Sequence, residues 1–200
     1  RRQRQMCIRD RTDIDIAIID YECGNIHSAR KAFELALSEL DISGKVIVTN
    51  DIKTISESDR LVLPGVGAFN ECYKKLMSIE GLSECIINKV FKQNVPILGI
   101  CVGLQLMADR GFENLETKGL GWISGQVKNL CPEDKKLKIP HMGWNQIQTV
   151  RASCISSDLD NKYRFYFVHS YYVQCEFRND VVLLARHGKT EFVAGFEKDN

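Results

Sequence analysis

Short apolar segments alternate with amphipathic helical segments in the first half of this chain, and this alternation constrains the fold more than any other feature. Residues 14–19 have the composition of a buried strand, and residues 25–40 carry apolar side chains at helical spacing. The same patterns predict further strands at 46–48, 61–63 and 97–100 and further helices at 84–91 and 102–109. Strands that alternate with helices are typical of a parallel sheet with helices on its faces.

After residue 121 the pattern changes to strands and turns. Strands are predicted at 125–128, 144–147, 165–168, 181–184 and 191–196. The sequence therefore predicts an α/β fold. Its mixed, largely parallel sheet is flanked by helices, and an antiparallel strand region is added in the C-terminal half. With no linker or repeat, residues 14–200 are expected to form a single domain.

Composition excludes several classes of function. The chain has 200 residues, 44% of them hydrophobic, and a net charge of +1, which gives no electrostatic reason to bind nucleic acid or a membrane surface. No apolar run approaches the roughly 18 residues of a membrane span. The 8 cysteines are scattered without a C-x-x-C pair, so a reduced, cytoplasmic protein is expected.

The first 13 residues differ from the rest of the chain. They are rich in arginine, lack a starting methionine and fit neither a helical face nor a strand. Two interpretations are open: a basic arm for an anionic partner, or a leader outside the fold. The second is favoured, because the segment is isolated in composition.

A cysteine stands between two glycines where a predicted strand meets a predicted helix, in Gly99-Ile-Cys101-Val-Gly103. A sharp strand-to-helix turn forces its central residue into a strained conformation and crowds the positions two before and two after it, where glycine is favoured. The start of a helix also favours a thiolate. Cys101 could instead be a small buried apolar residue. The pattern favours a nucleophile.

A nucleophile of this kind needs donors for an oxyanion. The backbone N–H of Val102 is one candidate. The loop Gly65-Val66-Gly67 follows the preceding predicted strand and could supply the other, although a Gly-x-Gly can equally be a tight turn.

Several segments together resemble the class I (triad) glutamine amidotransferases, and within them the glutaminase subunits of imidazole glycerol phosphate synthases. The segments are residues 20–25 (DYECGN), 64–67 (PGVG), 99–105 (GICVGLQ), 119–122 (GLGW), 140–144 (PHMGW) and 167–172 (FVHSYY). The resemblance covers residues 14–200 and implies the fold of that family.

The resemblance also implies a reaction. Cys101 would attack the carboxamide of glutamine and form a thioester, releasing ammonia and then glutamate without a cofactor. The ammonia would pass to a (β/α)₈ cyclase subunit, bound as a heterodimer, that makes imidazole glycerol phosphate and AICAR in histidine biosynthesis. The loop at residues 65–67 would reorient when the partner binds its ligand.

The resemblance assigns further residues. Gln105, Ser170 and Tyr171 would bind the α-amino and α-carboxylate groups of glutamine. His141, Met142 and Trp144 would lie in the interface with the cyclase. From residue type alone, Gln105 could be an ordinary polar helix residue, Tyr171 a half-buried strand residue and Trp144 a core residue. No histidine spacing indicates a metal site.

The sequence departs from the family in one respect. The family completes its triad with His and Glu in a Phe-His-Pro-Glu-Lys-like motif, which does not occur in these 200 residues. We therefore expect that the sequence is a fragment of a gene and that the 200-residue chain is inactive as a glutaminase. The alternatives are a binding-only scaffold and a paralogue that serves surface-polysaccharide or nucleotide-sugar biosynthesis.

Overall fold

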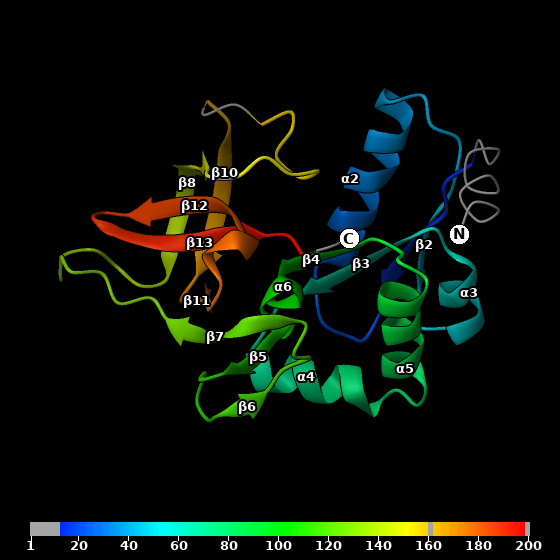
Figure 1. Ribbon diagram of the computed structural model, residues 1–200, viewed down its shortest axis with the longest axis horizontal. Helices are drawn as coiled ribbons and strands as arrows, with labels where there is room; N and C mark the ends of the chain where they lie inside the picture. Colours follow the sequence, from blue (N-terminus) through cyan, green and yellow to red (C-terminus); the bar gives the residue numbers. More distant parts are fainter. Residues whose placement is uncertain (1–12, 160–161, 199–200) are drawn as a thin grey trace. The chain divides into compact units, whose positions relative to one another are not determined.

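The computed structural model describes residues 13–159 and 162–198, which form two compact units (Figure 1). Unit 1 extends to Leu104 and unit 2 begins at Gln105. Residues 1–12 of the predicted leader lie outside the described residues. Asp13, the last residue of that predicted leader, forms a parallel β-bridge with Ser43 and so extends the sheet of unit 1.

Unit 1 is built on a four-stranded parallel sheet in the order β2-β1-β3-β4. The strands are β1 (Ile16–Ile19), β2 (Val46–Thr49), β3 (Arg60–Gly65) and β4 (Ile97–Cys101). The helices are α2 (Ile26–Glu39), α3 (Ile52–Glu57), α4 (Phe69–Ser78) and α5 (Leu82–Ile87), the last continued by a π-helical turn, η1 (Asn88–Lys92).

Helices cover both faces of this sheet. The apolar stripe of α2 packs on Ile16, Ile18 and Val62, while α4 and α5 lie on the opposite side (Figure 1). The alternate residues Ala17 and Ile19 are fully buried, so β1 is apolar on both faces, as parallel strands between helices are.

Unit 2 consists mainly of antiparallel strands. A short helix, α6 (Val102–Leu106), crosses the boundary between the units. One sheet has the order β11-β7-β5-β6 and includes a parallel β5–β7 pair; the others are β10-β8 and β13-β12-β9. The strands are β5 (Ala108–Gly111), β6 (Thr117–Lys118), β7 (Ile123–Asn129), β8 (His141–Gln146), β9 (Gln148–Thr149), β10 (Arg164–His169), β11 (Tyr171–Cys175), β12 (Val181–His187) and β13 (Thr190–Phe196), with a 3₁₀ turn, η2 (Arg178–Asp180).

The predicted fold class is confirmed, and one predicted element is wrong. The helix expected over residues 102–109 ends at Leu106, and a strand begins at Ala108. The structure also adds α3, α4, β5, β6, β9 and β11, which the sequence patterns did not predict. The expected single domain over residues 14–200 stays a prediction.

Candidate functional site: a cysteine at a strand-to-helix turn

Cys101 is the last residue of β4 and directly precedes α6. Its φ is 56°, in the left-handed region, where a residue with a Cβ is strained. The predicted strained turn at this cysteine is therefore confirmed. Its partner in the sheet register is Gly65, the last residue of β3, so the glycine loop starts beside the thiol.

The two glycines that flank the turn in space allow backbone to approach backbone. A Cβ at Gly103 would lie 1.8 Å from the carbonyl oxygen of Leu63. A Cβ at Gly65 would lie 2.5 Å from the amide nitrogen of Gly103. Only glycine fits at either position, so the carboxyl end of β3 packs directly on the start of α6.

The protonation of the thiol differs from the expectation. Desolvation raises the pKa of Cys101 above its ordinary value, and a hydrogen bond from the backbone N–H of Val102 only partly opposes this rise. The residue is nevertheless solvent-accessible. The expected lowering of its pKa by the start of a helix is therefore wrong. A helix of five residues offers little dipole to offset the loss of hydration.

The loop after β3 is held at both ends. The Tyr21 hydroxyl, itself 1% exposed, donates to the carbonyl of Pro64. The Cys72 thiol donates to the carbonyl of Val66 at 3.6 Å. A trans peptide directs its N–H opposite to its carbonyl, so the N–H of Gly67 points away from Cys72. The oxyanion role of Val102, Gly65, Val66 and Gly67 stays a prediction.

Two of the predicted substrate residues meet in unit 2. Gln105 is 8% exposed, and its Nε2 donates to the carbonyl of Tyr171 at 3.1 Å. Ser170 directly precedes Tyr171, and the Ser170 carbonyl accepts a hydrogen bond from the N–H of Leu130. The Ser170 and Tyr171 side chains are half-buried.

Comparison with known proteins agrees with this geometry. The profile of the family "glutamine amidotransferase class-I" matches residues 18–200. The chain belongs to the class I glutamine amidotransferases.

Relatives within the family are similar over most of their length. The chain is 42% identical to imidazole glycerol phosphate synthase subunit HisH of Brucella suis, covering 92% of this chain and 87% of the relative. It is 46% identical to the HisH subunit of Bradyrhizobium diazoefficiens, covering 88% and 82%.

Solved structures show the same fold at lower identity. A glutamine amidotransferase crystal structure superposes with a TM-score of 0.60 at 15% identity, covering 92% of this chain and 90% of the other. A glutamine amidotransferase from Thermotoga maritima gives a TM-score of 0.53 at 18% identity, covering 90% and 74%.

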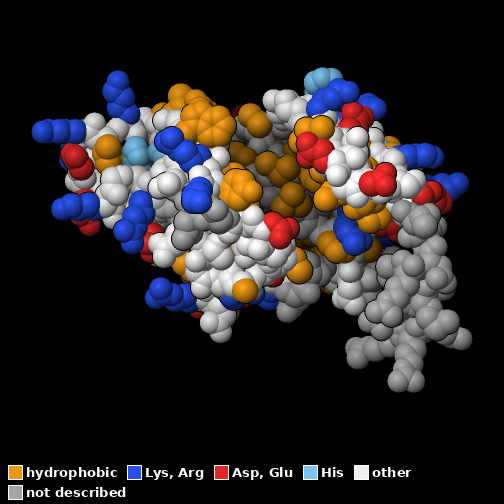
Figure 2. All heavy atoms as spheres, turned by 90° about the horizontal axis from the view of Figure 1, so that it is seen from above, with side chains coloured by type: hydrophobic (Ala, Val, Ile, Leu, Met, Phe, Trp, Pro, Cys, Tyr) orange, Lys and Arg blue, Asp and Glu red, His pale blue; other side chains and the backbone are white. Residues whose placement is uncertain are grey.

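The predicted interface residues differ in exposure. Met142 and Trp144 are 60% and 63% exposed, and their partners across the β8–β10 ladder, Val168 and Tyr166, are each 55% exposed. Figure 2 shows one face of the molecule, on which hydrophobic side chains lie among charged ones. His141 is only 5% exposed, so its ring does not contribute to this surface.

Among residues 13–159 and 162–198, no group of three or more His, Cys, Asp or Glu side chains could hold a metal ion. Within the same residues no helix has the length and apolarity to cross a membrane.

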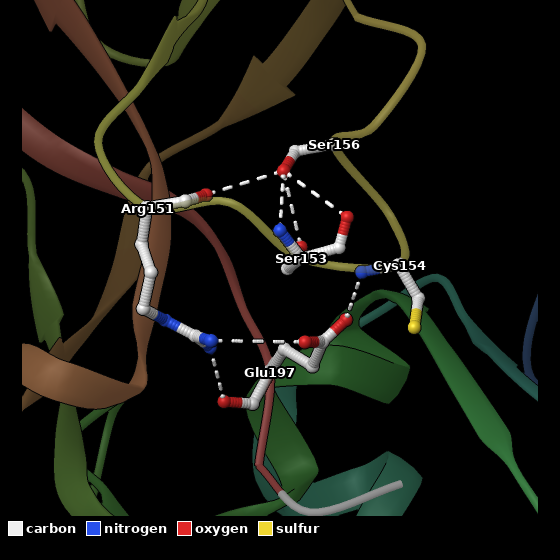
Figure 3. A network of polar contacts seen from close by, with 5 residues as sticks. All are labelled: Arg151, Ser153, Cys154, Ser156 and Glu197. Carbon is white, nitrogen blue, oxygen red and sulfur yellow. Dashed lines mark hydrogen bonds and ion pairs between the residues drawn. The ribbon is translucent and has the colours of Figure 1, made fainter.

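Cys154 is one of the exposed thiols, and its backbone belongs to a polar network within unit 2 (Figure 3). The Glu197 carboxylate accepts from the N–H of Cys154 at 3.1 Å, and Arg151 donates to the Glu197 carbonyl at 2.9 Å. Ser156 is 5% exposed, and its hydroxyl accepts from the N–H of Ser153 at 3.0 Å. This network fastens the segment after β9 to the end of β13.

Sequence reasoning missed two groups of residues. Tyr21 lay in a motif that supported the resemblance, but no pattern indicated that its hydroxyl reaches Pro64. The bonding between His141 and His169 was not predicted either, although each lies in a strand motif with aromatic neighbours.

Proposed function

We propose that this chain is the glutaminase subunit of an imidazole glycerol phosphate synthase, and that it passes ammonia to a cyclase subunit. The observation that carries the proposal is Cys101 at a φ of 56°, between β4 and α6 and beside Gly65. The relatives named HisH favour histidine biosynthesis over amidation of a sugar nucleotide or polysaccharide precursor.

The chemistry begins at the thiol. The sulfur of Cys101, after losing its proton, attacks the carboxamide carbon of glutamine, and the carbonyl oxygen becomes an oxyanion. A nearby donor is the N–H of Val102, which contacts the thiol. A second donor comes from the loop at Gly65–Gly67. One such donor contributes about 10²–10³ in rate in known enzymes.

Collapse of the oxyanion breaks the C–N bond and leaves a γ-glutamyl thioester on Cys101. The departing nitrogen takes up a proton and leaves as ammonia; water then attacks the thioester, giving glutamate and the free thiol. Because desolvation raises the pKa of Cys101, a general base is needed to form the thiolate at neutral pH. The ring nitrogens of His141 and His169 are bonded to each other and to neighbouring groups, so neither is assigned this role.

Substrate recognition is assigned to Gln105, Ser170 and Tyr171. The hydrogen bond from Gln105 Nε2 to the Tyr171 carbonyl uses one of the two N–H donors of the Gln105 amide. The amide oxygen is then the atom offered to the α-ammonium group of glutamine.

The partner surface is assigned to the exposed face of β8 and β10. Large aromatic side chains such as Trp144 are the type that anchors protein interfaces. The seven cysteines of the described segments are free, which fits a reducing compartment such as the cytoplasm.

The test is a glutaminase assay of the natural protein, both by itself and in the presence of a cyclase subunit with its nucleotide ligand. We expect glutamate release to rise on addition of the liganded cyclase and to be lost in Cys101→Ser. Equal rates with and without the cyclase would refute the coupling. Full activity in Cys101→Ser would refute the nucleophile.

A further inference from the structure

Unit 2 contains a continuous chain of hydrogen bonds that leads to the predicted glutamine-binding residues. His141 on β8 and His169 on β10 are direct partners in the antiparallel register. Nδ1 of His141 lies 2.9 Å from Nε2 of His169. Nδ1 of His169 lies 3.0 Å from the Tyr171 carbonyl, which also accepts from Gln105.

The direction of the protons is fixed at one end by Asn145. Its Oδ1 accepts from the N–H of Gln146 at 2.8 Å, and its Nδ2 donates to the carbonyl of Arg186 at 2.6 Å. These two contacts determine which way the amide faces. Nδ2 also lies 3.3 Å from Nε2 of His141, so that ring nitrogen must accept, and the His141 proton resides on Nδ1.

The same direction follows from the other end. A carbonyl oxygen only accepts, so the Tyr171 carbonyl requires a proton on Nδ1 of His169. Nε2 of a neutral His169 is then an acceptor, and it faces the protonated Nδ1 of His141. Both ends therefore demand the same tautomers, and no bond in the chain places two donors or two acceptors together.

The surroundings favour the neutral rings that this arrangement needs. The His141 ring stacks on Phe167 at 5.2 Å and meets the Phe192 ring edge-to-face at 5.6 Å. Burial, and to a smaller extent the neighbouring rings of His169 and His187, together lower the pKa of His141 to about 4. Burial also lowers the pKa of His169.

We propose that His141 and His169 are positioning residues for glutamine, because their bonded pair fixes the Tyr171 carbonyl and, through it, the amide of Gln105. The proposal rests on the function proposed above, in which Gln105 and Tyr171 bind the substrate. Neither histidine touches the reacting atoms in this role. Without the proton that His141 supplies, His169 can move its own proton to Nε2. The unprotonated Nδ1 of His169 then faces the Tyr171 carbonyl, and no hydrogen bond holds this carbonyl in place. Gln105 loses its anchor, which is the fixed Tyr171 carbonyl that accepts from its amide.

The ring of His187 provides a matched control. Its centroid lies 4.4 Å from that of His141, so it belongs to the same cluster. Its Nε2, however, bonds the carbonyl of Lys138 at 3.0 Å and takes no part in the chain. Similar losses at the two positions would indicate a structural role of the cluster instead.

The first experiment reads the tautomers by ¹⁵N NMR of histidine-labelled natural protein at pH 7. The 200-residue sequence contributes 4 histidines, and the resonances of each are assigned by single substitution. We expect protonated Nδ1 and unprotonated Nε2 at both His141 and His169. A proton on Nε2 of either ring, or a charged ring, would overturn the proposal.

The second experiment measures glutamine binding by calorimetry. His141→Phe should raise the dissociation constant about tenfold, the equivalent of one lost hydrogen bond. His141→Asn keeps a donor near the Nδ1 position and should stay within about threefold of the unaltered protein by the same reckoning. His187→Phe should stay within that range too. Equal losses in His141→Phe and His187→Phe would overturn the positioning role.

Failure of the inference is distinguishable from failure of the proposed function. If the unaltered protein does not bind glutamine, the proposed function fails and the ligand role fails with it. The position of the Gln105 amide can be measured without ligand, by NMR of its side-chain amide resonances. In His141→Phe these should broaden or shift relative to His187→Phe, and unchanged resonances would overturn the anchor.

Discussion

At the residue scale, Cys101 combines two properties that oppose each other. Its backbone holds the side chain at a strained turn, as a nucleophile at a strand-to-helix junction requires. Its pKa, however, is raised rather than lowered, because desolvation outweighs the hydrogen bond from Val102. In the resting state the thiol therefore keeps its proton.

This predicts two different patterns of cysteine labelling. A small alkylating reagent at pH 7 should modify the exposed Cys131 and Cys154 before Cys101. The rate of Cys101 modification should still increase above pH 9, because the pKa of Cys101 is raised above the ordinary thiol pKa of 9.0. A glutamine-like electrophile should instead select Cys101, since binding places the reagent at the thiol. Peptide mapping by mass spectrometry measures both. Rapid labelling of Cys101 by the small reagent at pH 7 would contradict the raised pKa.

At the element scale, the turn depends on glycines that let β3 and α6 touch. Gly103→Ala should lower the free energy of unfolding by about 3 kcal/mol or more, because the added Cβ would meet backbone at Leu63 that cannot move aside. Gly81→Ala is the control. Unlike Gly103, Gly81 has a positive φ, 75°, but a Cβ there would meet only the end of the Ile52 side chain at 3.9 Å.

The control should cost about 1 kcal/mol for the left-handed backbone alone. Chemical denaturation of both variants measures the difference. Equal losses would show that the close approach at Gly103 is relieved by a small shift of α6.

The strand pair β8–β10 gives a second prediction at this scale, for acid. In the unfolded chain a histidine titrates near 6.5, whereas in the folded chain the pKa of His141 is about 4 and that of His169 is also lowered. Between these values the unfolded state binds more protons, so stability should fall as pH drops from about 6.5 to 4. His187, Asn145, Phe167 and Phe192 face His141, and none of them is an anion that could hold a charged ring.

Thermal midpoints at pH 7 and pH 5 test this prediction. His141→Phe preserves an aromatic ring and removes one titrating group, so its midpoint should fall less over the same interval. An identical fall in both proteins would assign the acid sensitivity to other groups.

Local patterns predicted the sheet of unit 1 well, because each strand is a short apolar run followed by a helix or turn signal. They failed after Leu106, where apolar spacing continued to favour helix. There the carbonyls of Leu106 and Met107 accept from the N–H groups of Leu120 and Trp122, and β5 joins a sheet with β7. Hydrogen bonds between distant segments override local propensity, and no window of sequence contains them.

In the candidate site, too, local patterns predicted some residues and missed those that depend on distant contacts. Cys101 and its glycines were found because a turn of this type needs small residues at fixed spacing. Tyr21 was not given a role, since its bond to Pro64 joins residues 43 apart in the sequence. His141 was assigned to the interface by its neighbours in the motif, but strand alternation directs its ring inward.

At the scale of the whole molecule, the exposed face of β8 and β10 is the candidate surface for a partner subunit. Trp144 and Tyr166 meet edge-to-face with ring centroids 5.6 Å apart, and both are more than half exposed. The apolar residues Met142 and Val168 continue the same face along the ladder. A cluster of exposed aromatic and apolar side chains is typical of a protein-binding surface.

Trp144→Ala should therefore weaken association with the proposed cyclase partner by about 2 kcal/mol, or roughly 30-fold in dissociation constant, as expected for a central aromatic anchor. The thermal midpoint of the isolated chain should change little, because the side chain is 63% exposed. Phe177→Ala is the matched control, since Phe177 is 54% exposed in the same unit but lies outside the β8–β10 ladder. Surface plasmon resonance against the cyclase measures both variants. If Phe177→Ala weakened the complex as much as Trp144→Ala, or if neither did, the partner would bind a different face of the molecule.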